Sequence, residues 1–331
     1  MPYLALAALL ALCLVRGLWF VHGMTVPPDD DITRDLGFIQ GMRDGNLFGD
    51  PAYGGEFRWY PPLLHALAAL SAGLAGVSDA AFMPLWIAVG PWLGLLTPLS
   101  FFLMNQRLLG PWSAAAATAV LVLYNGAALP GDAAVSYTAL TLTPMLAWPM
   151  FFFGVRLIQG RAGSARLRDA LLLGSWIGLA FLAHTVPAVL LACIVTTVAF
   201  ATRGIAFRTL LWLSVAALAA LAWSLLFLGP LLVSYRLHIV NTVPGEWLHT
   251  LMAVPIRKWL IAANLPGIAA IAVVWWLRRY GPLSRVAVAI LGSWILVCAA
   301  FLLRHYACGY AGRTGGACGV FVLVSTISRH T

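Results

Sequence analysis

The chain has 331 residues, of which 62% are hydrophobic and only 9% are charged, and its mean hydropathy is +0.90. Water-soluble domains carry about 25% charged residues, so the composition excludes a soluble globular protein. The formal net charge of +9 does not indicate nucleic-acid binding, because the basic residues lie in short clusters between apolar stretches, where orientation signals and lipid headgroup contacts belong. The composition predicts an integral membrane protein whose partners include lipid but not nucleic acid.

Apolar runs long enough to cross a bilayer, about 20 residues, recur along the chain. The first run lacks a basic n-region and an A-x-A site, which favours a retained anchor over a cleaved signal peptide. The fold class predicted is all-α and polytopic, with about nine spans in one transmembrane domain, residues 1–303, before a short tail, residues 304–331. The expected spans are 3–22, 80–104, 112–129, 137–158, 169–185, 187–202, 209–233, 258–277 and 286–303.

The stretch 62–76 is apolar but short, and Pro61 and Pro62 open it, which is typical of an interfacial helix. If it does not span, the clusters around Arg161 and Arg278 fall on one side, as the positive-inside rule requires of the cytoplasm. All acidic residues except Asp169 then fall outside. This arrangement places the N-terminus inside and leaves two long external segments, 23–79 and 234–257.

The first external segment opens with two prolines and three consecutive carboxylates, Asp29, Asp30 and Asp31. Apolar residues then recur at helical spacing, which predicts a short amphipathic helix on the membrane surface: Ile32, Leu36, Ile39 and Met42. Adjacent carboxylates repel one another, so at least one perturbed pKa is expected. One of them could act as a general base, two could hold a divalent cation against a phosphate, or the group could be an N-cap with solvated neighbours.

The same segment continues through glycines, prolines and aromatic residues, with Arg58 and Tyr60 near its end. The pattern "G…DPxYGG…WYPPLLHAL" after an aspartate pair resembles the first external loop of GT-C glycosyltransferases, the group that includes protein mannosyltransferases, aminoarabinose transferases and arabinofuranosyltransferases. The resemblance covers residues 3–160 and implies a polyprenyl-phosphate sugar as donor and a glycan, lipid or protein as acceptor. It also implies that Asp30 or Asp31 is the catalytic base or the ligand of Mg²⁺ or Mn²⁺, with Asp29 as a further candidate.

Other external positions are candidates for binding the donor. His184 lies at a turn between two apolar runs, where it could orient a phosphate or simply cap a helix. Arg257 and Lys258 precede a span, where a lipid-linked phosphate would present its charge, although both also suit interface anchors. Asp132 could join the same site. With Arg58 and Tyr60, these residues complete the predicted substrate-binding set.

The predicted function is membrane glycosyl transfer on the non-cytoplasmic side, in a bacterial inner membrane. A non-catalytic scaffold of the same fold remains an alternative, and so does a lipid or solute transporter, although transporters usually carry ionisable residues near the bilayer midplane. The chain stops soon after Phe301, and Cys308 and Cys318 flank a glycine-rich loop where a disulfide could form in an oxidising compartment. We expect either a truncated or a minimal form of the family.

Overall fold

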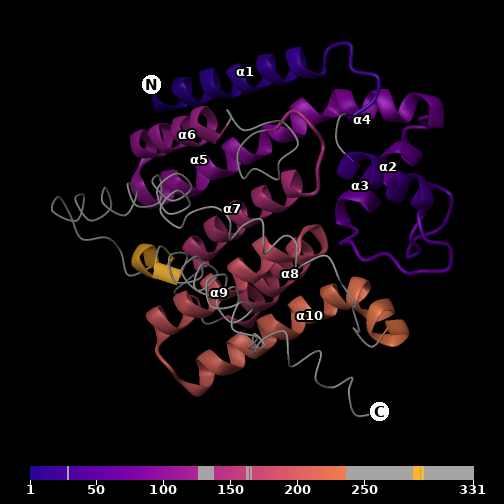
Figure 1. Ribbon diagram of the computed structural model, residues 1–331. Coiled ribbons are helices and arrows are strands. Elements are labelled where there is room, and N and C mark those ends of the chain that lie inside the picture. Colours follow the sequence, from indigo (N-terminus) through magenta and orange to yellow (C-terminus); the bar gives the residue numbers. More distant parts are fainter. Residues whose placement is uncertain are drawn as a thin grey trace, which may run out of the picture. The chain divides into compact units, whose positions relative to one another are not determined.

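The computed structural model describes residues 1–27, 30–125, 138–161, 164, 166–235, 286–290 and 292–293 (Figure 1). The chain divides into two compact units, Met1–Ser234 and Tyr235–Thr331, and the following account concerns the first. In chain order, its helices are α1 (Pro2–Val21), α2 (Asp30–Arg43), α3 (Leu63–Leu74), α4 (Asp79–Gly94), α5 (Leu96–Leu109), α6 (Pro111–Asn125), α7 (Pro144–Arg161), α8 (Leu167–Ala183), α9 (Thr185–Arg203) and α10 (Phe207–Tyr235).

The described residues are mostly helical, and four of their helices are long and apolar enough to cross a membrane. These are α1, the continuous α4–α5 pair, α9 and α10. This finding confirms the prediction of a helical membrane protein. The count of about nine spans stays a prediction, because 258–277 and most of 286–303 lie outside the described residues.

Hydrogen bonds between helix ends identify one end of the bundle, where basic residues gather. Gln106 at the end of α5 donates a hydrogen bond of 2.6 Å to the Tyr3 hydroxyl at the start of α1, and Trp212 in the first turns of α10 donates one of 3.2 Å to the Arg166 carbonyl before α8. We call this the basic end, because it gathers Arg107, Arg161, Arg166, Arg168, Arg203 and Arg208.

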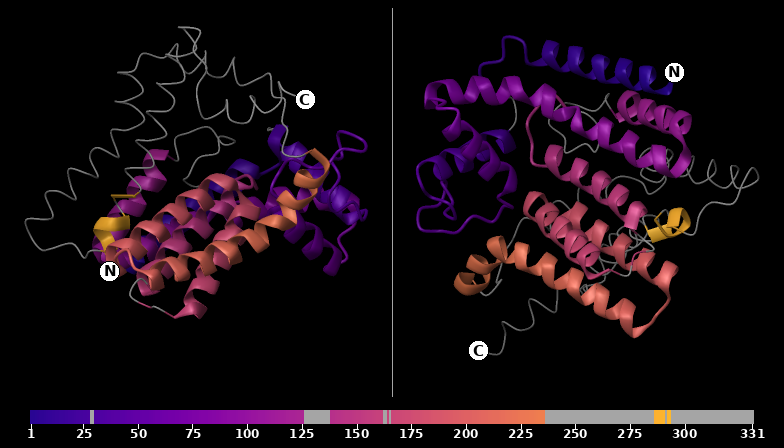
Figure 2. Two further views of the ribbon diagram at one scale, coloured as in Figure 1. Left: turned by 90° about the horizontal axis from the view of Figure 1, so that it is seen from below. Right: turned by 180° about the vertical axis from the view of Figure 1, so that it is seen from behind.

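Helices α2 and α3 lie at the opposite end, which we call the acidic end (Figure 2). Among the described acidic side chains only Asp169 lies at the basic end, as the charge pattern predicted.

Helix α3 has 12 residues and therefore spans roughly 18 Å, which is short of a hydrocarbon core of about 30 Å. One face of α3 is buried and the other is exposed, with Leu67, Leu70 and Leu74 exposed by 48%, 61% and 82%. An apolar stripe directed outward is consistent with the predicted interfacial helix.

Helix α2 differs from the prediction of an amphipathic helix with its apolar stripe in the membrane surface. Ile32 and Ile39 are 1% and 0% exposed, because the stripe packs into one core cluster with residues of α3, α4 and the start of α7. The apolar face of α2 is covered by protein. Arg43 fixes the end of the helix by pairing with Asp79 at 2.9 Å and donating to the Val77 carbonyl at 2.5 Å.

The helix expected over 137–158 begins only at Pro144. A proline disfavours helical geometry in the residue before it and suits the first turn of a helix. The preceding residues 138–143 form a buried non-helical segment, in which Thr141 donates to the Trp86 carbonyl at 3.2 Å. A Cβ on Gly90 would lie 2.2 Å from the Ala139 carbonyl oxygen. The absence of a side chain at Gly90 therefore allows this segment to pack against α4.

Two further glycines bring α8 close to α10. A Cβ on Gly174 would lie 2.1 Å from the Ala216 carbonyl oxygen, and one on Gly178 would lie 2.6 Å from that of Ala220. The G-x-x-x-G spacing of this pair is typical of close helix packing.

Candidate functional site

A compact loop after α2 carries two of the predicted site residues back to the helix. Gly45 ends α2 with a φ of +90°, and the Asn46 amide donates to the Gly41 carbonyl at 2.8 Å, as in a glycine-terminated helix. Gly49 and Phe57 form an antiparallel bridge, next to which the Arg58 amide donates to the Phe48 carbonyl at 2.8 Å. Arg58 and Tyr60 therefore return to the flank of α2.

The centre of the site is a completely buried carboxylate. Asp35 is 0% exposed, although it lies only one turn into α2. Its Oδ1 accepts hydrogen bonds from Nη2 and Nε of Arg34, at 2.9 Å and 3.3 Å, and its Oδ2 accepts one from the Thr143 hydroxyl at 3.2 Å. A buried charge is tolerated only when it is paired and hydrogen-bonded in this way.

His65 of α3 completes this group from the other side. Its Nε2 lies 3.2 Å from Asp35 Oδ1, although within the described residues neither ring nitrogen has a hydrogen-bond partner. His65 is 0% exposed, so this polar ring is buried in the interior of the acidic end.

Arg34 connects the buried carboxylate to an exposed one. Its Nη1 donates to Asp31 Oδ1 at 2.6 Å, while its Nη2 and Nε hold Asp35. The side chain of Asp31 is 61% exposed, whereas that of Asp35 is 0% exposed. We call Asp31, Arg34, Asp35, His65 and Thr143 the α2 charge cluster.

A stack of alternating cations and aromatic rings lies beside this cluster. The Arg34 guanidinium lies 4.1 Å from the centroid of the Tyr60 ring, Tyr60 stacks on Phe38 at 6.4 Å, and the Arg58 guanidinium lies 4.8 Å from the Phe38 centroid. Cation–π contacts are strongest when the cation is desolvated. Arg58 is 3% exposed, and among the described residues its Nε and Nη1 have no hydrogen-bond partner.

Burial changes the acidity of two members of the stack. Burial raises the pKa of the Tyr60 hydroxyl above its usual value, with Asp35 and Asp31 adding to the effect while Arg34 and a hydrogen bond with Thr143 oppose it. Tyr60 therefore stays protonated. Burial lowers the pKa of Arg58, and the nearby charge of Asp50 opposes that shift.

The structure brings some of the predicted site residues together and leaves others undescribed. Asp31, Arg58 and Tyr60 lie around the cluster and the stack, and Asp30 is the first residue of α2, of which only the backbone is described. Asp29, Asp132, Arg257 and Lys258 lie outside the described residues.

His184 is described, and it caps a helix. Its Nδ1 accepts a hydrogen bond of 3.3 Å from the Val186 amide, so it forms the N-cap of α9, and burial lowers its pKa. Ala183 and Ala188 beside it belong to a core cluster against which Leu63 of α3 packs. The turn therefore lies at the acidic end, next to the start of α3.

The described carboxylates offer a limited fit to a divalent cation. The Arg34 guanidinium already occupies the position between Asp31 and Asp35, so a metal shared by these two would have to displace it. Within the described residues no group of three or more His, Cys, Asp or Glu side chains could hold a metal. The pair of Asp30 and Asp31 as metal ligands stays a prediction.

The sequence interpretation missed Asp35, His65 and Thr143. A signal was present for Asp35, because positions 32, 35, 36 and 39 follow the spacing of one helix face and place it on the buried stripe. His65 similarly shares a helix face with Ala68 and Ala72. Nothing local marks Thr143, which reaches the cluster across 108 residues of sequence.

Comparison with known proteins adds no assignment: no family model matches the chain, and neither a curated protein nor a solved structure matches it.

Proposed function

We propose that this protein is a membrane glycosyltransferase that moves a sugar from a polyprenyl-phosphate donor to an acceptor on the non-cytoplasmic side of a bacterial plasma membrane. The observation that carries the proposal is the exposed carboxylate of Asp31, held at 2.6 Å by an arginine that the buried Asp35 and the Tyr60 ring fix in place. In active sites, a general base is held in position by neighbouring side chains that are more buried than the base itself.

In the proposed reaction, an acceptor hydroxyl oxygen attacks the anomeric carbon of the donor sugar. The bond from that carbon to the phosphate oxygen breaks, and polyprenyl phosphate leaves with the bonding electrons. Asp31, or Asp30 beside it, takes the proton of the attacking hydroxyl. The displacement inverts the configuration at the anomeric carbon.

The leaving phosphate needs cations in a site shielded from water. Arg34 is the cation nearest the proposed base in the described structure. Arg58 is a second candidate, because a buried guanidinium whose Nε and Nη1 lack protein partners among the described residues is costly unless an anion binds it. Arg257 and Lys258 keep their proposed role at the donor phosphate.

Tyr60 and His184 contribute to donor binding in the proposal. The raised pKa of Tyr60 keeps its hydroxyl available as a donor, and its ring supports Arg34. His184 lies beside the start of α3, and its pKa, lowered by burial, keeps it neutral. The separation of charges between the two ends supports an outward-facing site, since the basic end corresponds to the cytoplasm.

The test is transfer from a panel of polyprenyl-phosphate sugars by the purified full chain, with Asp31→Asn and Asp30→Asn compared with Asp44→Asn. Asp44 is an exposed carboxylate further along the same loop region, bonded to Gln40 at 3.1 Å. We expect transfer by the wild type and by Asp44→Asn, and loss in Asp31→Asn or Asp30→Asn. A wild type that transfers from no donor would favour a scaffold or a transporter.

A further inference from the structure

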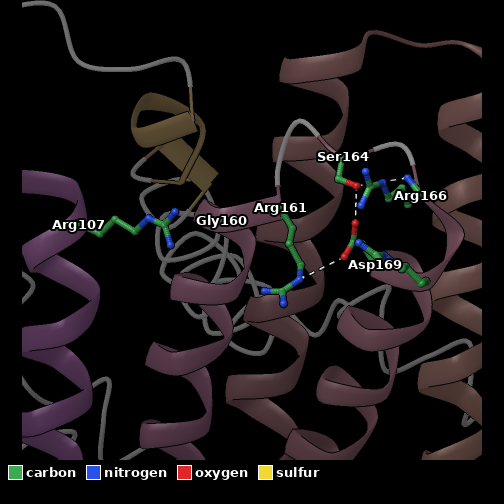
Figure 3. A pocket seen from close by; sticks show the side chains of 7 residues that line it. Arg107, Gly160, Arg161, Ser164, Arg166 and Asp169 are labelled. Carbon is green, nitrogen blue, oxygen red and sulfur yellow. Dashed lines mark hydrogen bonds and ion pairs between the residues drawn. The ribbon is translucent and has the colours of Figure 1, made fainter.

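A polar pocket lies at the basic end, away from the α2 charge cluster. Its volume is about 590 Å³, which is within the range of small-molecule sites. The last turns of α5 and α7, Ser164 and Arg166 before α8, and the first turn of α8 form it (Figure 3). The lining residues are Arg107, Gly160, Arg161, Ser164, Arg166, Arg168 and Asp169.

Contacts from neighbouring helices fix the backbone around the pocket. Arg203 of α9 donates to the Ser164 carbonyl, and Trp212 of α10 donates to the Arg166 carbonyl at 3.2 Å. A Cβ on Gly160 would lie 3.1 Å from Arg107 Nη1, so the absence of a side chain lets the guanidinium approach α7. The helical lining residues therefore belong to α5, α7 and α8, and α9 and α10 hold the backbone of Ser164 and Arg166.

The charge of the lining is strongly unbalanced. Four of the seven lining residues are arginines and one is an aspartate. Asp169 pairs with Arg161 at 3.2 Å and accepts a hydrogen bond from the Ser164 hydroxyl. In the described part of the chain no carboxylate forms an ion pair with Arg107, Arg166 or Arg168.

Two of these arginines lie where a cation is unfavourable. Arg166 is the N-cap of α8 and Arg168 is in its first turn, although the N-terminus of a helix carries a partial positive charge. Orientation in the membrane requires only that basic residues lie on the cytoplasmic side, and it does not require them to converge on one cavity. Their common place on the lining of one cavity favours an anion in it.

We propose that this pocket binds a phosphate group, either as a lipid headgroup or as part of a soluble phosphate compound. Guanidinium groups bind phosphate oxygens bidentately, and a phosphate monoester or diphosphate has enough charge to match the lining arginines that form no ion pair among the described residues. Basic pockets between helices on the cytoplasmic side suit anionic headgroups. The site is independent of the proposed transferase reaction, since it lies at the opposite end.

The experiment measures binding of two probes to the purified full chain in a zwitterionic detergent. Short-chain phosphatidic acid and pyrophosphate are titrated calorimetrically, with short-chain phosphatidylcholine as the neutral control. The variants are Arg107→Gln and Arg168→Gln, both at exposed positions. The matched control is Arg208→Gln, which removes an exposed charge from the same end without lining the pocket.

We expect each pocket variant to weaken binding by about ten-fold and Arg208→Gln by less than about two-fold, because screened surface charges contribute little. Binding of phosphatidic acid without pyrophosphate would identify a headgroup site, and binding of pyrophosphate in competition with the lipid would identify a soluble ligand. Both results support the proposal. Absence of binding of either probe to the wild type, or binding by both variants as tight as by Arg208→Gln, would overturn it.

Discussion

Replacing Asp35 by alanine should destabilise the protein far more than replacing an exposed carboxylate close to it. The substitution removes the acceptor of hydrogen bonds from Arg34 and Thr143 and the only ionic neighbour of His65 that the described residues provide. Removing one partner of a buried ion pair costs about 3–5 kcal/mol. Arg34 keeps Asp31 and is 34% exposed, so the lower part of that range applies.

Thermal unfolding in detergent, followed by tryptophan fluorescence, measures the effect. A change of 1 kcal/mol shifts the Tm of a domain of 150–250 residues by roughly 2–4 °C, so a cost of about 3 kcal/mol for Asp35→Ala should lower the Tm by roughly 6–12 °C. The control is Asp44→Ala, which changes an exposed residue and should shift the Tm by less than about 2 °C. A Tm for Asp35→Ala within that margin of the control would refute the reasoning, because the buried carboxylate would then contribute nothing to the fold.

Three further predictions follow from the same contacts. Arg58→Met should keep the free energy of unfolding within about 1 kcal/mol of the wild type, since an apolar side chain of similar size replaces a buried charge that is not fully paired. The variant should nevertheless lower sugar transfer. A fall in Tm large enough to account for the loss of transfer would contradict this expectation. Gly174→Ala should cost about 1–3 kcal/mol, because its Cβ would lie 2.1 Å from the Ala216 carbonyl oxygen, whereas Gly73→Ala has nothing within 4 Å and should be neutral by the same thermal assay. Burial holds the pKa of His184 below 6.5 in the folded protein, so the unfolded chain binds more protons at this residue. Its contribution to stability is therefore lost as the pH falls below about 6.5. His184→Asn, which can still cap α9, should show a smaller fall in Tm on acidification than the wild type.

Composition and periodicity were sufficient to predict the helical membrane fold, because a bilayer restricts the chain to long apolar helices whose residues are visible in the sequence. The assignment of 62–76 as a non-spanning helix relied on charge, and the structure gives the same separation: Arg107 and Arg161 lie at one end, and Asp35 and Asp79 at the other. Both predictions depend only on the hydropathy of short segments and on the distribution of charge along the chain, which can be read directly from a sequence.

The details that depend on distant contacts could not be predicted. Asp35 shares the helical spacing of the buried stripe of α2, but nothing in the sequence pairs it with Thr143, far along the chain, or with His65 of α3. Similarly, the late start of α7 reflects a buried segment that packs against Gly90 of α4. Arg58, predicted as a substrate-binding residue, is buried because the loop after α2 folds it over Phe38.

The measurement that tests the central claim most directly is sugar transfer by purified full-length protein. Wild type, Asp31→Asn, Asp30→Asn and Asp44→Asn are assayed in parallel with a panel of polyprenyl-phosphate donors, after equal Tm values show that each variant is folded. The account predicts transfer by wild type and Asp44→Asn, with at least a hundred-fold loss, on the order of the contribution of a general base, in Asp31→Asn or Asp30→Asn. Full transfer by both of these variants would contradict the proposed base, and no transfer by the wild type from any donor would contradict the proposed enzyme.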